Sequence, residues 1–268
     1  MFKIIVYQSV CDRWSKLGTV EIIGVEGLPI VKPGDNLGAL ISTAAKRNGN
    51  PIKNRDVVVV THIVVSVAEN QLVDLNKIVP SEFAKNLASR LDKDPALVEV
   101  VLRESRGIRR IGDGVLITET RHGFVCANSG VDKSNVPGEH TVAPLPADPD
   151  ASAARIRKEI HEASGRDVAV IVSDTFGRPL RMGETNMAVG VAGLKPIRDR
   201  RGEKDLFGYV LRVKQTAVAD ELASAAELVI GQADEGVPAA IIRGYKYSRS
   251  KRSKATELVR PRDEDLFI

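Results

Sequence analysis

The sequence predicts a mixed fold, α+β or mixed α/β, because strand-like and helix-like segments follow one another without a regular βαβ alternation. Residues 57–60 form a β-branched run that is typical of a strand buried on both faces. Residues 215–230 carry apolar side chains at helical spacing, and Gly231 follows them as a stop signal. A chain of 268 residues suits one large domain or two small ones.

The first part of the chain predicts strands and one capped helix. Residues 19–31 combine a strand with a turn signal. Asn36 is a natural N-cap for the helix that follows it. The apolar run at residues 63–65 is interpreted as a buried strand, like the run before it. His62 would then lie inside a strand.

The middle of the chain predicts two helices and a strand pair. Ser81 precedes apolar residues at helical spacing in residues 83–91, and it can cap that helix. Asp94 and the proline after it begin a second helix, because proline is favoured at the first helical position. Residues 115–117 and 123–127 have the pattern of paired strands.

The last part of the chain begins with a proline-rich segment, residues 140–152, which predicts a linker. An amphipathic helix follows and ends at Gly165. Residues 168–172 are a short apolar strand, after which a long loop region is expected. Residues 238–242 form the last predicted strand.

Composition and charge exclude several classes of protein. The hydrophobic fraction of 43% and the charged fraction of 28% are ordinary for a globular chain, which excludes wholesale disorder. Aromatic residues make up only 4%, so few side chains can stack on nucleic-acid bases. Residues 243–268 hold eight basic and four acidic residues, and the rest of the chain is neutral. The basic run is interpreted as a solvated tail, with a phosphate or nucleic-acid contact as the alternative.

Cysteine content and hydropathy bear on the cellular setting. Cys11 and Cys126 cannot form a disulfide framework, which predicts a reducing, cytoplasmic environment. Residues 1–14 alternate in polarity like a strand and lack the long apolar region of a signal peptide. No segment approaches the roughly 20 apolar residues of a membrane span. We therefore expect neither a membrane nor a nucleic acid as a partner.

Asp174 and Thr175 are the first candidate site, because they follow a predicted buried strand. Ligands often bind at the carboxyl ends of such strands. A carboxylate beside a hydroxyl suits a hard cation such as Mg²⁺ or Mn²⁺. The alternative is that Asp174 caps a turn.

Three glycine-containing loops are further candidates. Residues 126–135 end a strand and place Asp132 and Asn135 three apart, so one turn could bring both to one face; an Asx-turn loop is the alternative. Residues 231–238 could bring backbone N–H groups close to phosphates, although they lack the ending of a P-loop. Residues 27–30 form a turn whose exposed backbone could line a nucleotide pocket.

Two histidines stand out, and considered alone both favour a structural role. His62 and His122 have no metal-ligand spacing to another histidine or cysteine. The sequence also contains no GxSxG, HExxH or GxGxxG element, so hydrolase, zinc-protease and Rossmann interpretations lack support.

Five segments in a fixed order resemble one family. They read GLPIVKPGD, CANSGVDKSN, SDTFGRP, GVAGLKPIRDRRGEKDLFG and GQADEGVPAAIIRG. This order is similar to the coenzyme F420-0:L-glutamate ligases, the F420 gamma-glutamyl ligase family. The resemblance covers roughly residues 20–244 and extends to the RPRDEDLF tail.

The resemblance implies a GTP-dependent ligase that adds L-glutamate through a gamma-linked amide to coenzyme F420-0, through an acyl phosphate. It also implies Mg²⁺ or Mn²⁺, with two ions expected, together with K⁺. The implied fold is F420 gamma-glutamyl ligase-like, mixed α/β and homodimeric. Residues 17–246 would form the ligase domain, after an N-terminal extension at residues 1–16. Residues 247–268 would be a basic, then acidic, tail of the same domain.

The resemblance also assigns roles to individual residues. It implies Asp132 and Asp174 as catalytic metal ligands, joined by Thr175 and Gln232. The implied nucleotide-binding residues come from four segments of the chain: Gly27, Leu28, Pro29 and Ile30; His62; Asn135; and Ile230, Gly231, Ala233, Asp234, Glu235, Gly236 and Val237. Arg178, Arg198 and Arg200 are further candidates for anion contacts, with surface charges as the alternative.

One segment departs from the family pattern. Where the family has lysines in T-[HQ]-K-[IV]-V-S-K-A-E-G, this chain has Ile63 and Val67, and Asn70 replaces the glycine. Loss of a charge-assisted phosphate contact costs about 1.5–3 kcal/mol. Three explanations follow: another cation substitutes, the substrate differs, or the chain is a nucleotide- and metal-binding paralogue whose ligase activity is weak, lost or altered.

Overall fold

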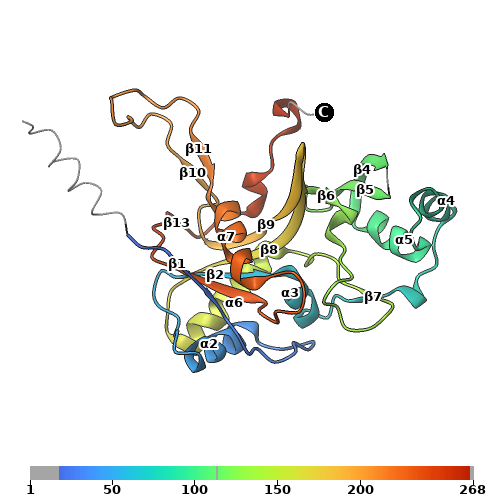
Figure 1. Ribbon diagram of the computed structural model, residues 1–268, viewed down its shortest axis with the longest axis horizontal. Coiled ribbons are helices and arrows are strands. Elements are labelled where there is room, and N and C mark those ends of the chain that lie inside the picture. Colours follow the sequence, from blue (N-terminus) through green and yellow to red (C-terminus); the bar gives the residue numbers. More distant parts are fainter. Residues whose placement is uncertain (1–17, 113, 266–268) are drawn as a thin grey trace, which may run out of the picture.

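The computed structural model describes residues 18–112 and 114–265, and it confirms a mixed α and β architecture (Figure 1). A six-stranded sheet forms the centre. Its strands β2 and β8 run parallel, and the other neighbouring pairs are antiparallel. In sheet order the strands are β1 (Glu21–Gly24), β12 (Ala239–Arg243), β2 (Val57–Thr61), β8 (Ala169–Arg178), β9 (Arg181–Leu194) and β13 (Arg249–Ser250).

Helices cover the central sheet, with α2 (Leu37–Arg47) and α6 (Pro149–Ser164) on one side and α7 (Val218–Ile230) on the other (Figure 1). The strands β2 and β12 and the first part of β8, residues 169–172, are apolar on both faces, as a covered sheet requires. The side chain of Asn36 accepts a hydrogen bond from the backbone of α2, which confirms the predicted cap. Gly165 ends α6 in a left-handed conformation, also as predicted.

A smaller lobe with its own apolar core lies beside the sheet. Ser81 and Asp94 cap its two helices, as the sequence predicted. The core includes Leu87, Val101 and Leu116. The lobe contains α4 (Glu82–Leu91), α5 (Pro95–Arg103), β4 (Ser105–Gly112), β5 (Val115–Thr120) and β6 (Val125–Ala127), with β3 (Val73–Asp74), β7 (Thr141–Val142) and the 3-10 turns η1 (Leu75–Lys77) and η2 (Asn128–Gly130) at its base.

Two further segments extend from the body. The strands β10 (Ile197–Asp199) and β11 (Gln215–Ala217) form the base of a long exposed arm, residues 197–217 (Figure 1). The C-terminal tail contains the short turns η3 (Ala255–Leu258) and η4 (Arg262–Glu264). Its Ala255 is buried against the main core, so the tail belongs to the same folded body.

Two expectations about segments near the central strands were wrong. Residues 63–65 belong to helix α3 (His62–Ala68) rather than to a strand, because tertiary packing can override the weak strand preference of a short β-branched run. The region after residue 172 is a long hairpin of β8 and β9 rather than a loop, since the two strands pair from Val170 to Arg178.

Two further expectations need correction. Residues 140–152 are not a linker: Ala143 and Leu145 are buried, and β7 pairs within this segment. The helix expected at residues 215–230 begins at Val218, because residues 215–217 pair with β10. The strand predicted at residues 1–14 lies outside the described residues.

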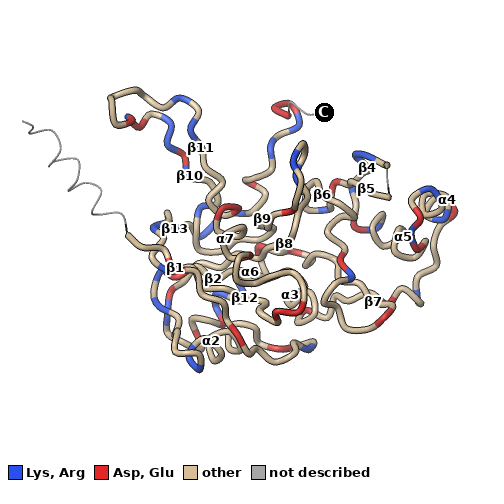
Figure 2. Tube along the Cα trace, viewed as in Figure 1, with Lys and Arg blue, Asp and Glu red and all other residues tan. Residues whose placement is uncertain are grey.

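Charges are distributed over the whole trace, with lysine and arginine interspersed among acidic residues (Figure 2). Part of the basic C-terminal run is paired: Arg243 forms an ion pair with Asp56, and Arg249 with Asp167. Within the described ranges, no helix is both long and apolar enough to span a membrane.

Candidate functional site

A cleft of about 290 Å³ opens at the carboxyl end of β2, where its parallel pairing with β8 ends. This is the edge where α/β sheets usually bind ligands. Five separate segments line it, drawn from the turn before α2, the β2–α3 junction, the loop after η2, the hairpin of β8 and β9, and the α7–β12 loop. The candidate segments of the sequence therefore meet in one place, although they lie far apart along the chain.

Asp174 lies within β8 at the base of this cleft, and its side chain is almost fully buried. His62 is the first residue of α3, and its Nε2 atom lies 3.3 Å from Asp174 Oδ1. The backbone N–H of Thr175 donates to the same carboxylate oxygen at 2.7 Å. Because β8 continues to Arg178, Asp174 does not cap a turn, which was the alternative interpretation.

Thr175 belongs to a polar cluster with Asn186 of β9 and Gln232 of the α7–β12 loop. Its hydroxyl lies 2.7 Å from Asn186 Oδ1 and 3.1 Å from Gln232 Oε1. The amide of Gln232 also donates to Asn186 Oδ1 at 3.2 Å. Asn186 is only 1% exposed, and the sequence analysis missed it. The one feature of the sequence that could have indicated a role for Asn186 is its polar amide side chain just before the apolar run of β9.

Asp132 approaches the cleft from the loop after η2. Its Oδ1 atom accepts hydrogen bonds from the backbone N–H and the hydroxyl of Ser134, at 2.8 and 2.9 Å. Its backbone forms an isolated bridge with Ala143, which ties the loop to the strand segment before α6. Asp132 is thus positioned by local and distant contacts together.

The turn before Asp132 has an unusual backbone. Asn128, Ser129 and Gly130 all adopt left-handed conformations, with φ values of 50°, 56° and 68°. Such a run is costly for residues with side chains. The hydroxyl of the buried Ser129 lies 2.7 Å from the hydroxyl of Ser105 and 2.6 Å from that of Thr118, which holds the turn in place. The small lobe therefore anchors the loop that carries Asp132.

Gly130 allows this turn to pack directly against the base of the cleft. A Cβ atom there would lie 2.7 Å from Leu145 Cγ and 3.0 Å from Asp174 Oδ2. A side chain would therefore displace Leu145 and crowd the Asp174 carboxylate, in addition to the strain of a positive φ. These close contacts thus explain why the CANSGVDKSN motif has a glycine at position 130.

The electrostatics of the cleft centre on His62 and the acidic groups. Burial alone would lower the pKa of His62, but the charge and hydrogen bond of Asp174, with a smaller contribution from the charge of Asp132, raise it. Burial, followed by the charge of Asp174, raises the pKa of the Cys126 thiol. Cys126 therefore stays protonated and is a poor nucleophile.

Two unpartnered polar atoms lie at the base of the cleft. Ser173 Oγ and His62 Nδ1 are buried without a hydrogen-bond partner in the described part of the chain, whereas His62 Nε2 contacts Asp174. Buried polar groups in native proteins usually have partners, so such atoms in a cleft indicate a missing ligand. His62, which favoured a structural role when considered alone, is therefore a lining residue of the cleft.

The cleft collects most of the residues that the resemblance implied. Two of them do not line it: the carbonyl of Gly27 accepts a hydrogen bond from Arg47, and Asp234 is exposed beside the cleft. The candidate anion contacts Arg178, Arg198 and Arg200 do not line it either. The implied residues that do line it are Leu28, Pro29, Ile30, His62, Asp132, Asn135, Asp174, Thr175, Ile230, Gly231, Gln232, Ala233, Glu235, Gly236 and Val237.

The donor set fits a hard cation held by oxygen atoms. It combines the carboxylates of Asp132 and Asp174 with neutral oxygens from side chains around them. Over residues 18–112 and 114–265, no group of three or more His, Cys, Asp or Glu side chains is placed to hold a metal ion. A cation here would thus keep open positions, which Mg²⁺ commonly fills with water and substrate phosphates. The apolar residues of the cleft can pack against a planar base.

The chain is similar to known proteins over most of its length. The sequence profile described as F420-0:gamma-glutamyl ligase matches residues 27–244 of the chain. The match begins at the turn before α2 and ends directly after β12, so it includes all five segments that line the cleft.

Individual relatives align over nearly their full length. A protein of Methanothermobacter thermautotrophicus, named coenzyme F420:L-glutamate ligase, is 50% identical over 92% of this chain and 98% of its own. Proteins with the same name from Methanocaldococcus jannaschii and Methanopyrus kandleri are 46% and 45% identical. They cover 92% and 94% of this chain, and 96% and 100% of their own chains.

Proposed function

Because the chain belongs to the F420-0:gamma-glutamyl ligase family, we propose that it joins L-glutamate to coenzyme F420-0 in a reaction driven by GTP. The observation that carries the proposal is the convergence of Asp132, Asp174, Thr175 and Gln232 in one cleft within the matched region. Their oxygen atoms would hold a hard divalent ion, which would offset the negative charge of the nucleotide phosphates. A reducing cytoplasm is the proposed setting, since Cys126 is a free buried thiol.

The proposed chemistry has two steps. A carboxylate of F420-0 attacks the γ-phosphate of GTP, which forms an acyl phosphate and releases GDP. The amine of L-glutamate then attacks the acyl carbon, the phosphate leaves, and the amine loses a proton to give the amide. The protein mainly positions the reactants and stabilises charge, as in other phosphoryl transfers.

The residues of the cleft would have different roles in this reaction. Asp132, Asp174, Thr175 and Gln232 would hold Mg²⁺ or Mn²⁺, with K⁺ as a further cation. The divalent ions would neutralise the charge that develops on the transferred phosphoryl group. His62 fixes the orientation of Asp174 through its 3.3 Å contact. The apolar wall around Ile30 and Val237 would hold the base.

A second candidate function is a paralogue that binds GTP and metal with weak, lost or altered ligase activity. The observation that favours it is the position of Val67, which lines the cleft where the family has a lysine. That substitution removes a charge beside the proposed nucleotide site, whereas most of the other implied residues line the cleft.

Mass spectrometry distinguishes the two functions. We expect a reaction with F420-0, L-glutamate, GTP, Mg²⁺ or Mn²⁺, and K⁺ to give a glutamate-sized gain in the mass of F420-0, together with GDP and phosphate. Omission of glutamate should abolish the gain and serves as the control. Binding of GTP without any mass gain would instead support the paralogue.

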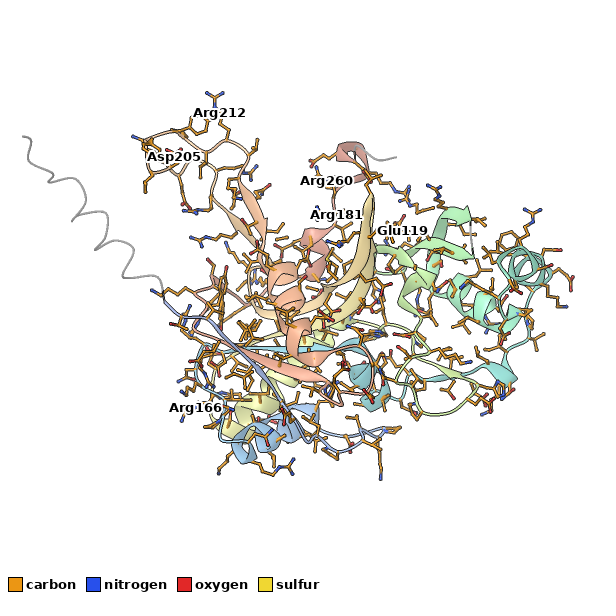
Figure 3. All side chains as sticks on the ribbon, in the orientation of Figure 1. Glu119, Arg166, Arg181, Asp205, Arg212 and Arg260 are labelled. Atoms are coloured by element: carbon orange, nitrogen blue, oxygen red, sulfur yellow. The ribbon has the colours of Figure 1, made fainter. Side chains whose placement is uncertain are left out.

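We also propose that the protein is a homodimer, with the arm at residues 197–217 as its contact. The arm extends away from the body, with Asp205 and Arg212 near its end (Figure 3). Phe207 is 95% exposed and Val213 is 88% exposed, and Leu206 and Tyr209 are exposed beside them. Exposed apolar groups of this kind mark interaction surfaces.

A double substitution tests the role of the arm. Phe207→Asp with Val213→Asp should convert the dimer to a monomer, because charges would then replace the apolar contact. The oligomeric state is measured by light scattering after size-exclusion chromatography. Val79→Asp is the control, since Val79 is similarly exposed but lies outside the arm. A double variant that remains dimeric would contradict the assignment.

A further inference from the structure

A second cavity, of about 310 Å³, lies beside the start of β8, and none of its lining residues lines the cleft. Val168, directly before β8, forms part of its wall, whereas β8 lines the cleft only from Ser173 onward. The other walls come from α6, β9 and the segment around β13. The proposed reaction uses none of these residues, so the cavity is a separate feature of the molecule.

Positive charge exceeds negative charge around this cavity. Arg157, Arg249 and Lys251 line it, and Asp167 is the one described carboxylate residue beside them. Both arginines share that carboxylate: its Oδ1 atom pairs with Arg157, and its Oδ2 atom lies 3.2 Å from Arg249 Nη2. Lys251 is exposed and forms no ion pair within residues 18–112 and 114–265. The three cations and one carboxylate give the lining a net formal charge of +2.

The guanidinium of Arg157 is held in a fixed position. Its Nε atom donates a hydrogen bond to the carbonyl of Val168 at 2.7 Å. A Cβ atom at Gly193 would lie 2.8 Å from the same Nε atom, so the missing side chain of this glycine leaves room for the guanidinium. A cation that is already ordered loses less conformational entropy when an anion binds to it.

Tyr247 and Ser250 add features that suit an oxyanion. Ser250 Oγ accepts hydrogen bonds from the backbone N–H groups of Arg252 and Ser253, at 3.3 and 3.1 Å, which leaves its hydroxyl proton free to donate to a ligand. The ring of Tyr247 is buried against Arg55, whose guanidinium carbon lies 5.1 Å from the ring centre. Arg55 therefore adds positive potential from behind the wall of the cavity.

The charge and the volume of the cavity indicate the class of ligand. Cations gathered in one place repel each other unless an anion lies between them. A dianion would balance the net charge of the lining, whereas a single carboxylate would leave half of it uncompensated. A phosphate group carries a charge of about −1.5 to −2 at neutral pH, and its oxygens match the fork of donors on an arginine. The volume is near the lower end for small-molecule sites, so a small organic group fits beside the phosphate.

We propose that this cavity binds a phosphate dianion, either inorganic phosphate or a small phosphate monoester, through Arg157, Arg249 and Lys251. The site is independent of the proposed function. It also gives part of the basic C-terminal run a role, because residues 249–251 line the cavity. A phosphate contact was the alternative to a solvated tail in the sequence. The bound anion would join β13 to α6 and to the start of β8.

Calorimetry tests the site directly. Inorganic phosphate is titrated into the full chain in Tris chloride buffer without divalent ions, and glycerol 3-phosphate and succinate are titrated separately. We expect one phosphate site per chain and at least about threefold weaker binding of succinate, whose two separated carboxylates match a compact cluster of donors less well. Tighter binding of glycerol 3-phosphate would assign the site to a monoester, and tighter binding of inorganic phosphate to the free ion. Absence of binding by both phosphates, or equal binding of succinate, would overturn the proposal.

Lys251→Gln and Arg252→Gln form a matched pair. Each removes one positive charge from an exposed position, but only Lys251 lines the cavity. We expect Lys251→Gln to weaken phosphate binding about tenfold or more, as for loss of one charge-assisted hydrogen bond. Arg252→Gln should change the affinity less than about threefold, because surface charges outside a site are screened. Equal effects of the two substitutions would indicate a diffuse attraction to the basic segment and would refute the site.

Asp174→Asn separates this cavity from the cleft. Asp174 lines the cleft and not the cavity, so we expect this variant to bind phosphate with the affinity of the wild type. A changed affinity would place the bound phosphate in the cleft and contradict a second site. None of these titrations requires turnover. Failure of the proposed ligase activity would therefore leave the phosphate site intact, and absence of phosphate binding would leave the ligase assignment intact.

Discussion

Replacement of Asp174 by asparagine is expected to lower ligase turnover by about a hundred- to a thousandfold, the scale of losing one preorganised electrostatic contact. Asparagine preserves the shape of the side chain but removes its charge. Asp174 is only 8% exposed, so bulk water cannot replace that charge. Steady-state kinetics of phosphate release, with calorimetry of Mn²⁺ binding in the presence of nucleotide, measure the loss.

The titration of His62 provides a readout independent of activity. In the metal-free protein, burial lowers the pKa of His62, and the charge and hydrogen bond of Asp174, together with the charge of Asp132, raise it above its ordinary value. In Asp174→Asn most of the compensation is lost, so the pKa of His62 should fall. NMR titration of the histidine ring measures this shift. A variant with full turnover and an unchanged His62 pKa would contradict the central role of Asp174.

Asp220→Asn is the matched control for this substitution. Asp220 is another half-buried carboxylate, on α7, and burial raises its pKa. Its Oδ1 atom accepts a hydrogen bond from the backbone N–H of Ala188 at 3.0 Å, which an asparagine can preserve. Asp220 does not line the cleft. We therefore expect turnover within about threefold of the wild type. The substitution removes only a favourable negative charge from the first turn of α7, near the N-terminus of that helix.

Gly190→Ala is expected to cause the largest loss of stability, more than about 3 kcal/mol in the free energy of unfolding, at the upper end of overpacking effects. Gly190 lies in β9 where the first residue of α6, Pro149, crosses the strand. A Cβ atom there would overlap the carbonyl group of Pro149 and lie 2.8 Å from its Cβ. Because the obstacle is backbone, no side-chain rotation can relieve the overlap.

Gly177→Ala provides the control in the same hairpin. A Cβ atom at Gly177 would meet no heavy atom within 4 Å. Its φ is also not in the left-handed region. Urea unfolding should therefore give a free energy within about 1 kcal/mol of the wild type. Equal stability of the Gly190 and Gly177 variants would show that α6 can move away from the sheet.

Local chemistry made several features predictable from the sequence. Asn36, Ser81 and Asp94 cap the helices that follow them, because their side chains accept the hydrogen bonds that the first turn leaves unpaired. The apolar run of β2 required burial on both faces. The order of the motifs identified the family and, with it, the carboxylates Asp132 and Asp174 that line the cleft.

The tertiary structure decided the rest. Residues 62–68 form a helix because the chain leaves the sheet at the cleft, which no local pattern indicates. Asn186 joins the site through pairing of β8 with β9, where Thr175 lies opposite Asn186. The lack of a lysine or arginine in the described cleft is likewise a property of five distant segments taken together. Caps and apolar runs depend on neighbours along the chain, so the sequence reveals them. The site depends on residues brought together only by the packed sheet, so the three-dimensional structure was required to define it.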